Sequence, residues 1–239
     1  MINRSSPRSV GYGQQATAEE IDAGLRAYML GVYNYMSIAL GITGLAAFGV
    51  SQSPELMNAV FGTPLKWVVM LAPLGMVFFL SARINKIQAS TAQMLFWVFS
   101  LLMGVSLASI FVIYEMGSIT RVFFITAASF AGLSLVGYTT KKNLSAMGSF
   151  LIIGLFGLII ASVVNIFIGS PGLEFVISII GVLIFAGLTA YDTQKIKLMY
   201  MESDGSEVSQ KKSIMGALTL YLDFLNMFLF LLRLMGNRN

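Results

Sequence analysis

The sequence contains no cysteine and no histidine among its 239 residues. Disulfide bonds and thiolate chemistry are therefore excluded, and so are imidazole metal sites and any nucleophilic pair in which histidine activates serine or cysteine. Charged residues are also scarce, because Asp, Glu, Lys and Arg make up only 11% of the chain, against roughly 25% in soluble proteins. These absences argue against an enzyme and against a soluble domain, and no cofactor is expected.

The chain is instead rich in apolar sequence, with 56% hydrophobic residues and a mean hydropathy of +0.80. After a polar N-terminal segment come seven apolar runs, each about 18–23 residues long, which is the length of a helix that crosses a bilayer. They cover residues 28–50, 65–82, 92–114, 122–140, 147–168, 173–191 and 213–235. The sequence therefore predicts an all-α polytopic membrane protein, a seven-transmembrane-helix bundle formed by residues 28–239.

Residues 1–27 are polar and lack the apolar core and small-residue cleavage site of a signal peptide. We interpret them as a cytosolic N-terminal tail. The segment TAEE, which begins at Thr17, resembles a capping box and predicts that a helix begins near this point.

Lysine and arginine are unevenly distributed between the two ends of the predicted spans. Eleven lie in the tail and in the second, fourth and sixth connections, whereas four lie on the opposite side: Lys66, Arg121, Arg233 and Arg238. Basic residues collect on the cytosolic side of membrane proteins. The bias therefore predicts a cytosolic N-terminus and, with seven spans, an external C-terminus. These charges orient the chain in the membrane and do not indicate nucleic-acid binding.

Asp223 lies in the middle of the last apolar run. A charged side chain at that depth costs roughly 2.5–3.5 kcal/mol on insertion scales, so it is expected to face protein or water. Gly216, Thr219, Asp223 and Asn226 are spaced by three, four and three residues, which places them on one face of a helix. This polar face is expected to turn toward the inside of the bundle.

A second aspartate, Asp192, ends the sixth run in the segment GLTAYDTQK, with Thr189 one turn earlier on the same face. The sixth and seventh runs are antiparallel, so both carboxyl groups belong to the cytosolic half and can be neighbours. Arg83 ends the second run at a comparable depth. It is either a latch that pairs with an ionised aspartate or a simple topology charge that reaches the lipid headgroups.

Two interpretations of the aspartate pair are open. The carboxyl groups either lock helices together, or share one proton and sense pH, because two adjacent like charges cannot both ionise cheaply. Their oxygens suit Ca²⁺, but two carboxylates fall short of the 6–8 oxygens of a tight site, so Asp192 and Asp223 predict only weak or transient calcium binding. Tyr138, Tyr191 and Tyr221 are interpreted as aromatic residues of the membrane interface.

The stretches GLTAYDTQKIK and LTLYLDFLNMFLFLLRLMG are similar to those of the Bax inhibitor-1 (transmembrane Bax inhibitor motif) family, in its bacterial branch. The similarity covers essentially everything after the tail. It implies a seven-helix fold in the bacterial inner membrane, with the last helix wrapped by the others. It also implies a pH-sensitive Ca²⁺ leak governed by an aspartate pair, which here would be Asp192 and Asp223, together with Arg83 of the second helix.

Other functions are also considered. Some bacterial relatives are associated with restraining a membrane-bound ATP-dependent protease, which suggests a regulatory protein that binds such a partner through its polar tail. A proton-coupled transporter is less favoured because the sequence shows no inverted repeat and no matching broken helices. An intramembrane aspartyl protease is disfavoured because neither aspartate lies in a Gly-x-Gly-Asp setting.

Overall fold

The structure, a computed structural model, describes residues 18–239, and these form helices and no strand. The helices are α1 (Ala18–Ser51), α2 (Pro54–Phe61), α3 (Leu65–Arg83), α4 (Ala89–Leu107), α5 (Ile110–Ile113), α6 (Met116–Thr139), α7 (Ser145–Ile168), α8 (Pro171–Leu198) and α9 (Ser206–Met235). Seven stretches are long and apolar enough to cross a membrane: α1, α3, α4 with α5, α6, α7, α8 and α9. The predicted all-α, seven-span architecture is confirmed.

Two boundaries differ from the expected ones. The third span was expected to be continuous over 92–114, but α4 ends at Leu107, where the Ala108 amide bonds to the carbonyl of Val105 in a tightened last turn. Helix α1 begins at Ala18, so its first turns belong to the segment predicted as tail. Residues 1–17, including Thr17 of the predicted capping box, lie outside the described part of the chain.

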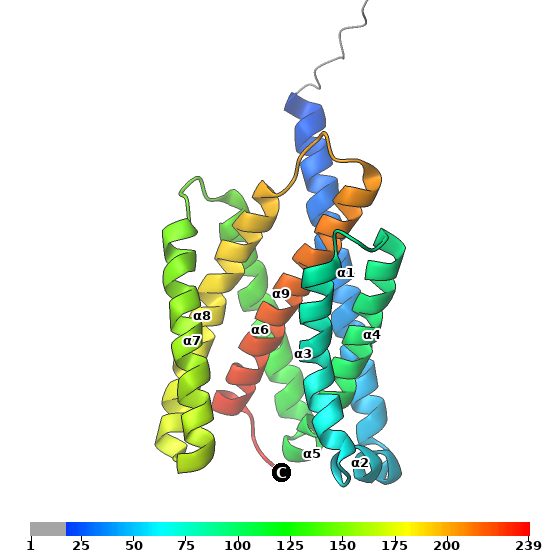
Figure 1. Cartoon of the computed structure of the whole chain (residues 1–239). Helices are drawn as coiled ribbons and strands as arrows, with labels where there is room; N and C mark the ends of the chain where they lie inside the picture. Colours follow the sequence, from blue (N-terminus) through cyan, green and yellow to red (C-terminus); the bar gives the residue numbers. More distant parts are fainter. Residues whose placement is uncertain (1–17) are drawn as a thin grey trace, which may run out of the picture.

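Helix α9 is the centre of the bundle. Its spanning segment is 67% buried, against 11–44% for the other six. It packs against α8, α1, α6 and α4, and it crosses the middle of the bundle in Figure 1. The expectation of a central C-terminal helix is thus confirmed. Lipid cannot solvate a polar face, so the helix that carries Asp223 is the one that the others surround.

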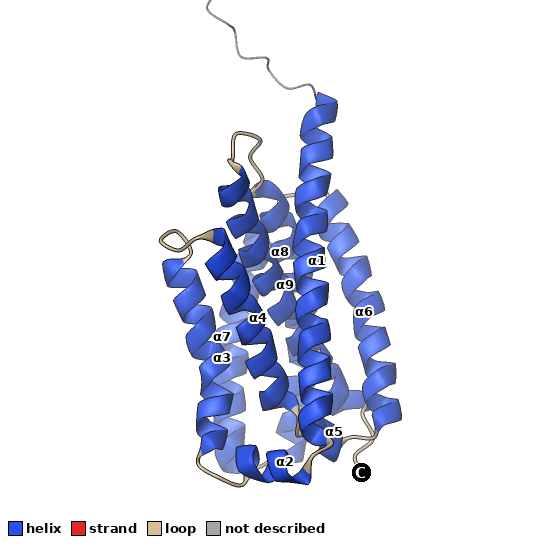
Figure 2. Cartoon of the chain, turned by 90° about the vertical axis from the view of Figure 1, so that its right-hand side faces the viewer, coloured by secondary structure: helices blue, strands red, loops and turns tan. Residues whose placement is uncertain are grey.

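The two ends of the bundle are distinct. The start of α1 and the connections α3–α4, α6–α7 and α8–α9 lie at one end, which we call the N-terminal end (Figures 1 and 2). Helices α2 and α5 and the C-terminus lie at the other end. The start of α1 and the C-terminus are therefore on opposite sides, as seven spans require. The assignment of the N-terminal end to the cytosol remains a prediction from the distribution of basic residues.

Candidate functional site

The structure brings Asp192 and Asp223 together. Asp192 lies in the last two turns of α8 and Asp223 near the middle of α9, and their carboxyl groups are within hydrogen-bonding reach of each other. The two residues are 8% and 4% exposed. Among residues 22–239, whose burial is described, no other aspartate, glutamate, lysine or arginine is buried. The second carboxyl oxygen of Asp223, Oδ2, has no hydrogen-bond partner in the described protein.

Small residues allow the neighbouring helices to approach α8 closely at the pair. Gly137 of α6 lies against the backbone of Ala190, and a Cβ atom there would be 2.9 Å from the Ala190 carbonyl carbon. Gly148 of α7 lies against the ring of Tyr191 in the same way. Thr193 of α8 also donates a hydrogen bond to the Ser134 hydroxyl of α6 at 3.3 Å. The carboxyl pair is therefore held between closely packed helices.

Arg83 does not join the pair. It is exposed at the end of α3, and α3 packs mainly against α4 and α2 at the edge of the bundle. None of the salt bridges among the described residues involves Arg83. The expected meeting of two acids with this arginine is thus not observed. The sequence predicted a similar depth in the membrane for Arg83 and the pair, but depth does not determine where a helix lies around the bundle, and α3 lies at its edge. The basic residue that follows Asp192 by one turn on α8 is Lys195, and its side chain is exposed.

Sequence similarity to known proteins identifies the family of this chain. A family model described as "Inhibitor of apoptosis-promoting Bax1" matches residues 25–239. The chain belongs to the Bax inhibitor-1 family. A relative named "Inner membrane protein YbhL" from Escherichia coli strain K12 is 44% identical over 90% of this chain and 94% of its own length.

Further relatives of this Bax inhibitor-1 protein are also bacterial. An uncharacterized protein of Rickettsia prowazekii is 49% identical over 91% of this chain and 92% of its own length. Another, from Caulobacter vibrioides, is 42% identical over 95% and 96% of the two chains. The similarity thus spans the whole helical bundle, and the chain is a multi-pass membrane protein of this family.

The three residues expected to support the pair in this Bax inhibitor-1 protein bond within their own helices. The hydroxyl of Thr189, which is buried, donates to the carbonyl of Phe185 at 2.7 Å. Thr219 and Asn226 are partly buried and donate to carbonyls one turn earlier on α9, at 3.0 and 2.8 Å. Each polar group is satisfied locally, so a low-polarity interior tolerates it. None of these bonds reaches Asp192 or Asp223.

Tyr221 lies in the core, so its assignment to the membrane interface was wrong. Its side chain is fully buried, and its hydroxyl lies 2.7 Å from the hydroxyl of Thr43 on α1. The Thr43 hydroxyl also lies 2.9 Å from the carbonyl oxygens of Ala39 and of Ser100 on α4. This cluster joins α1, α4 and α9. This cluster is predictable from the sequence, since a hydroxyl two residues from Asp223 in the same span also needs a buried partner.

Gln194 is a second polar residue whose role was not predicted from the sequence. Its amide nitrogen donates to the Lys142 carbonyl at 2.8 Å, and its amide oxygen accepts from the Leu144 amide at 2.9 Å. It therefore fastens the α6–α7 connection to α8, two residues after Asp192. A buried glutamine at a helix end carries no spacing signal of its own, and only the fold reveals its partners.

The metal-binding capacity of the site is limited to the aspartate pair. Within the described residues, no three or more aspartate, glutamate, histidine or cysteine side chains form a cluster suited to a metal ion. Two carboxylates offer at most four oxygens, whereas a tight Ca²⁺ site uses about 6–8. The donor set therefore fits a hydrated cation that binds weakly in passing better than it fits a resident ion.

Proposed function

We propose that this protein is a pH-sensitive Ca²⁺ leak of the bacterial inner membrane, controlled by Asp192 and Asp223. The observation that supports it is the contact of two buried carboxyl groups from two helices at the centre of the bundle. Intramembrane ionisable residues of this kind usually mark ion or proton pathways. The proposal assigns the pair to gating and to transient cation binding.

The gating step follows from the electrostatics of the contact. With one proton between them, the carboxyl groups form a hydrogen bond that joins α8 to α9. Loss of that proton leaves two adjacent negative charges in a low-dielectric interior, which repel each other strongly. The repulsion separates α8 from α9, and the exposed carboxylates then attract a hydrated cation. Lys195, one turn after Asp192 on α8, adds an exposed positive charge at the N-terminal end.

The sign of the pH dependence is fixed by this step. The shared proton stabilises the closed arrangement, so closure is favoured at low pH and is lost as the pH rises through the range where the proton leaves. Ca²⁺ flux therefore increases with pH. If one proton controls opening, the increase is at most about tenfold per pH unit, which corresponds to 1.36 kcal/mol per unit.

The test is Ca²⁺ flux into liposomes loaded with a calcium dye, measured between about pH 5 and pH 8. Asp223→Asn and Asp192→Asn keep the shape and hydrogen-bonding capacity of the carboxyl group but cannot lose the shared proton. Each is expected to flatten the pH profile. Glu174→Gln is the matched control, because it removes a carboxylate at the opposite end of α8, away from the pair, and is expected to preserve the profile.

Two outcomes contradict the proposal. One is a wild-type protein that gives no Ca²⁺ flux at any pH in this range. The other is a pair of asparagine variants that both retain the wild-type pH profile. A thermal unfolding curve for each variant in detergent separates loss of gating from loss of the fold.

A second candidate function is the restraint of a membrane-bound ATP-dependent protease. The observation that favours it is the projection of the first turns of α1 beyond the ends of the other helices (Figure 2). Asp22, Ala23 and Arg26 are exposed there and available to a partner. Deletion of residues 1–20 is expected to abolish an effect on the protease while liposome flux is retained. If both persist or both are lost, the tail is not the separate partner site.

A further inference from the structure

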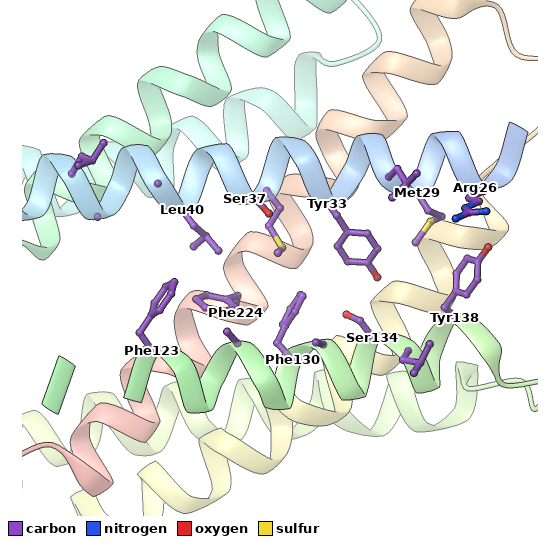
Figure 3. A pocket seen from close by; sticks show the side chains of 18 residues that line it. Arg26, Met29, Tyr33, Ser37, Leu40, Phe123, Phe130, Ser134, Tyr138 and Phe224 are labelled. Carbon is purple, nitrogen blue, oxygen red and sulfur yellow. The ribbon is translucent and has the colours of Figure 1, made fainter. Parts of the chain in front are cut away.

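A large cleft opens on the side of the bundle between α1 and α6. Helix α1 packs mainly against α4 and α9, and α6 against α8 and α9, so the two do not close over the space between them. The cleft has a volume of about 1020 Å³, and Phe224 of α9 lies at its back (Figure 3). This volume is at the upper end of the roughly 300–1,000 Å³ of pockets that hold small molecules.

The lining of the cleft changes in polarity along its length. Of the described residues that line it, one is charged: Arg26, which lies with Tyr138 at the N-terminal end (Figure 3). The hydroxyl groups of Tyr33 and Ser134 follow, and the far end is lined by apolar residues such as Leu40. A cation and hydroxyl groups at one end and hydrocarbon at the other are complementary to an amphipathic anion.

The position of the cleft indicates that its occupant comes from the bilayer. The walls belong to two membrane-spanning helices, and residues 26–45 of α1, which line it, extend over about 28 Å. That length exceeds the hydrocarbon thickness of one leaflet, about 15 Å. The opening therefore faces acyl chains.

The shape of the cleft favours a flexible chain over a helix. The rings of Tyr33, Phe123 and Phe130 project into the space between α1 and α6 (Figure 3). A helix with its side chains needs a channel roughly 10–12 Å wide and free of such obstacles. An acyl chain can bend between the rings and remain in contact with them.

We propose that this cleft binds one acyl chain of an anionic phospholipid, whose phosphate is held by Arg26 at the N-terminal end. Arginine matches phosphate geometry with paired hydrogen bonds, and the hydroxyl of Tyr138 is placed to add another. The aromatic rings that line the rest of the cleft contact the acyl chain. This assignment does not depend on the calcium-leak proposal.

The lipid would lie directly beside the aspartate pair. Phe224, at the back of the cleft, follows Asp223 in the chain, and Ser134, on its wall, is bonded to Thr193, which follows Asp192. The bound acyl chain therefore contacts Phe224, next to Asp223, and Ser134, whose hydroxyl is bonded to the residue after Asp192, while neither aspartate lines the cleft.

The test is native mass spectrometry of the full chain in a mild detergent, titrated with phosphatidylglycerol or with phosphatidylcholine of the same acyl chains. We expect one phosphatidylglycerol to bind per chain more tightly than phosphatidylcholine. Arg26→Gln is expected to weaken phosphatidylglycerol binding roughly tenfold, since it removes a charge-assisted contact. It is expected to weaken phosphatidylcholine binding less, because the choline cation of that headgroup repels Arg26 and already weakens its contact with the phosphate. Arg121→Gln, on α6 but outside the cleft, is the charge control.

A variant that fills the cleft gives a second, independent test of lipid binding. Ala131→Phe adds a ring to the wall of the cleft and is expected to abolish tight binding of both lipids, whereas Ala128→Phe, an exposed position on α6 that does not line the cleft, is expected to leave binding intact. Thermal unfolding in detergent shows that each variant is folded.

Four results would overturn the lipid site. Arg26→Gln could leave phosphatidylglycerol affinity unchanged, or Ala131→Phe could bind as well as the wild type. Tight binding that emerges only after deletion of residues 1–17 would instead identify the N-terminal segment as the occupant. A dimer that Ala131→Phe converts to a monomer, with no tight lipid bound to the wild type, would identify a second copy of the chain.

Discussion

The contact of Gly137 with Ala190 permits a sharp test of how the aspartate pair is held. Gly137 is buried on α6 and lies against the backbone of Ala190, a residue of α8 that precedes Asp192 by two positions. Gly137→Ala adds a single methyl group, which would lie 2.9 Å from the Ala190 carbonyl carbon and closer still to its oxygen. Because these are backbone atoms, no rotamer change can relieve the clash.

The expected cost can be worked from this geometry. Ordinary Cβ contacts begin near 3.4 Å, and the Ala190 oxygen is the nearest atom, so the two backbones must separate by roughly an ångström. Overpacking of this kind costs roughly 1–3 kcal/mol, and the gain in helix propensity from glycine to alanine returns about 0.5–1 kcal/mol. Because the clash is with backbone atoms that cannot move aside, the overpacking cost lies near the upper end of that range. We expect a net loss of roughly 2 kcal/mol, which lowers Tm by about 4–8 °C for a chain of this size.

Gly132 supplies the matched control on the same helix. No atom of the described residues lies within 4 Å of a Cβ added at Gly132. Gly132→Ala therefore gains helix propensity without a clash and is expected to leave Tm unchanged or slightly raised. Tm of both variants is measured by thermal unfolding in detergent. Equal Tm values for the two alanine variants would refute the reasoning, because they would show that α6 and α8 are not in backbone contact beside Asp192.

The remaining predictions concern the polar residues that the fold revealed. Tyr221→Phe is expected to destabilise the protein by about 0.5–1.5 kcal/mol, and Thr43→Val by about 1–3 kcal/mol because it leaves the buried Tyr221 hydroxyl without its partner. The double variant should cost less than the sum of the two, and strict additivity in thermal unfolding would exclude their hydrogen bond. Gln194→Leu should accelerate hydrogen exchange at the Leu144 amide, which loses its acceptor. Lys195→Gln, at an exposed neighbouring position, should leave that exchange rate unchanged, and slow exchange in both variants would show that the Gln194 bond does not protect the amide.

Several features of this protein follow from the sequence alone. The seven spans and the inward orientation of Asp223 are set by the bilayer, which accepts apolar helices and rejects a carboxyl group. A span carrying one polar face must be surrounded, and α9 is the most buried span in the described structure. The meeting of Asp192 with Asp223 also followed from the order of the antiparallel spans. These inferences depend on the one-dimensional position of each residue along the membrane normal, which the sequence encodes directly.

The tertiary structure decided what that single dimension leaves open, namely the position of each helix around the bundle. Arg83 and the aspartates have similar predicted depths, yet α3 packs against α4 and leaves Arg83 exposed, away from the pair. Tyr221 meets Thr43 because α1 lies against that side of α9. The lateral cleft exists because α1 and α6 each pack against α9 without closing over the space between them. Which helices become neighbours depends on how small and large side chains of distant segments fit together, as Gly137 fits against Ala190. That fit can be seen only in the assembled bundle.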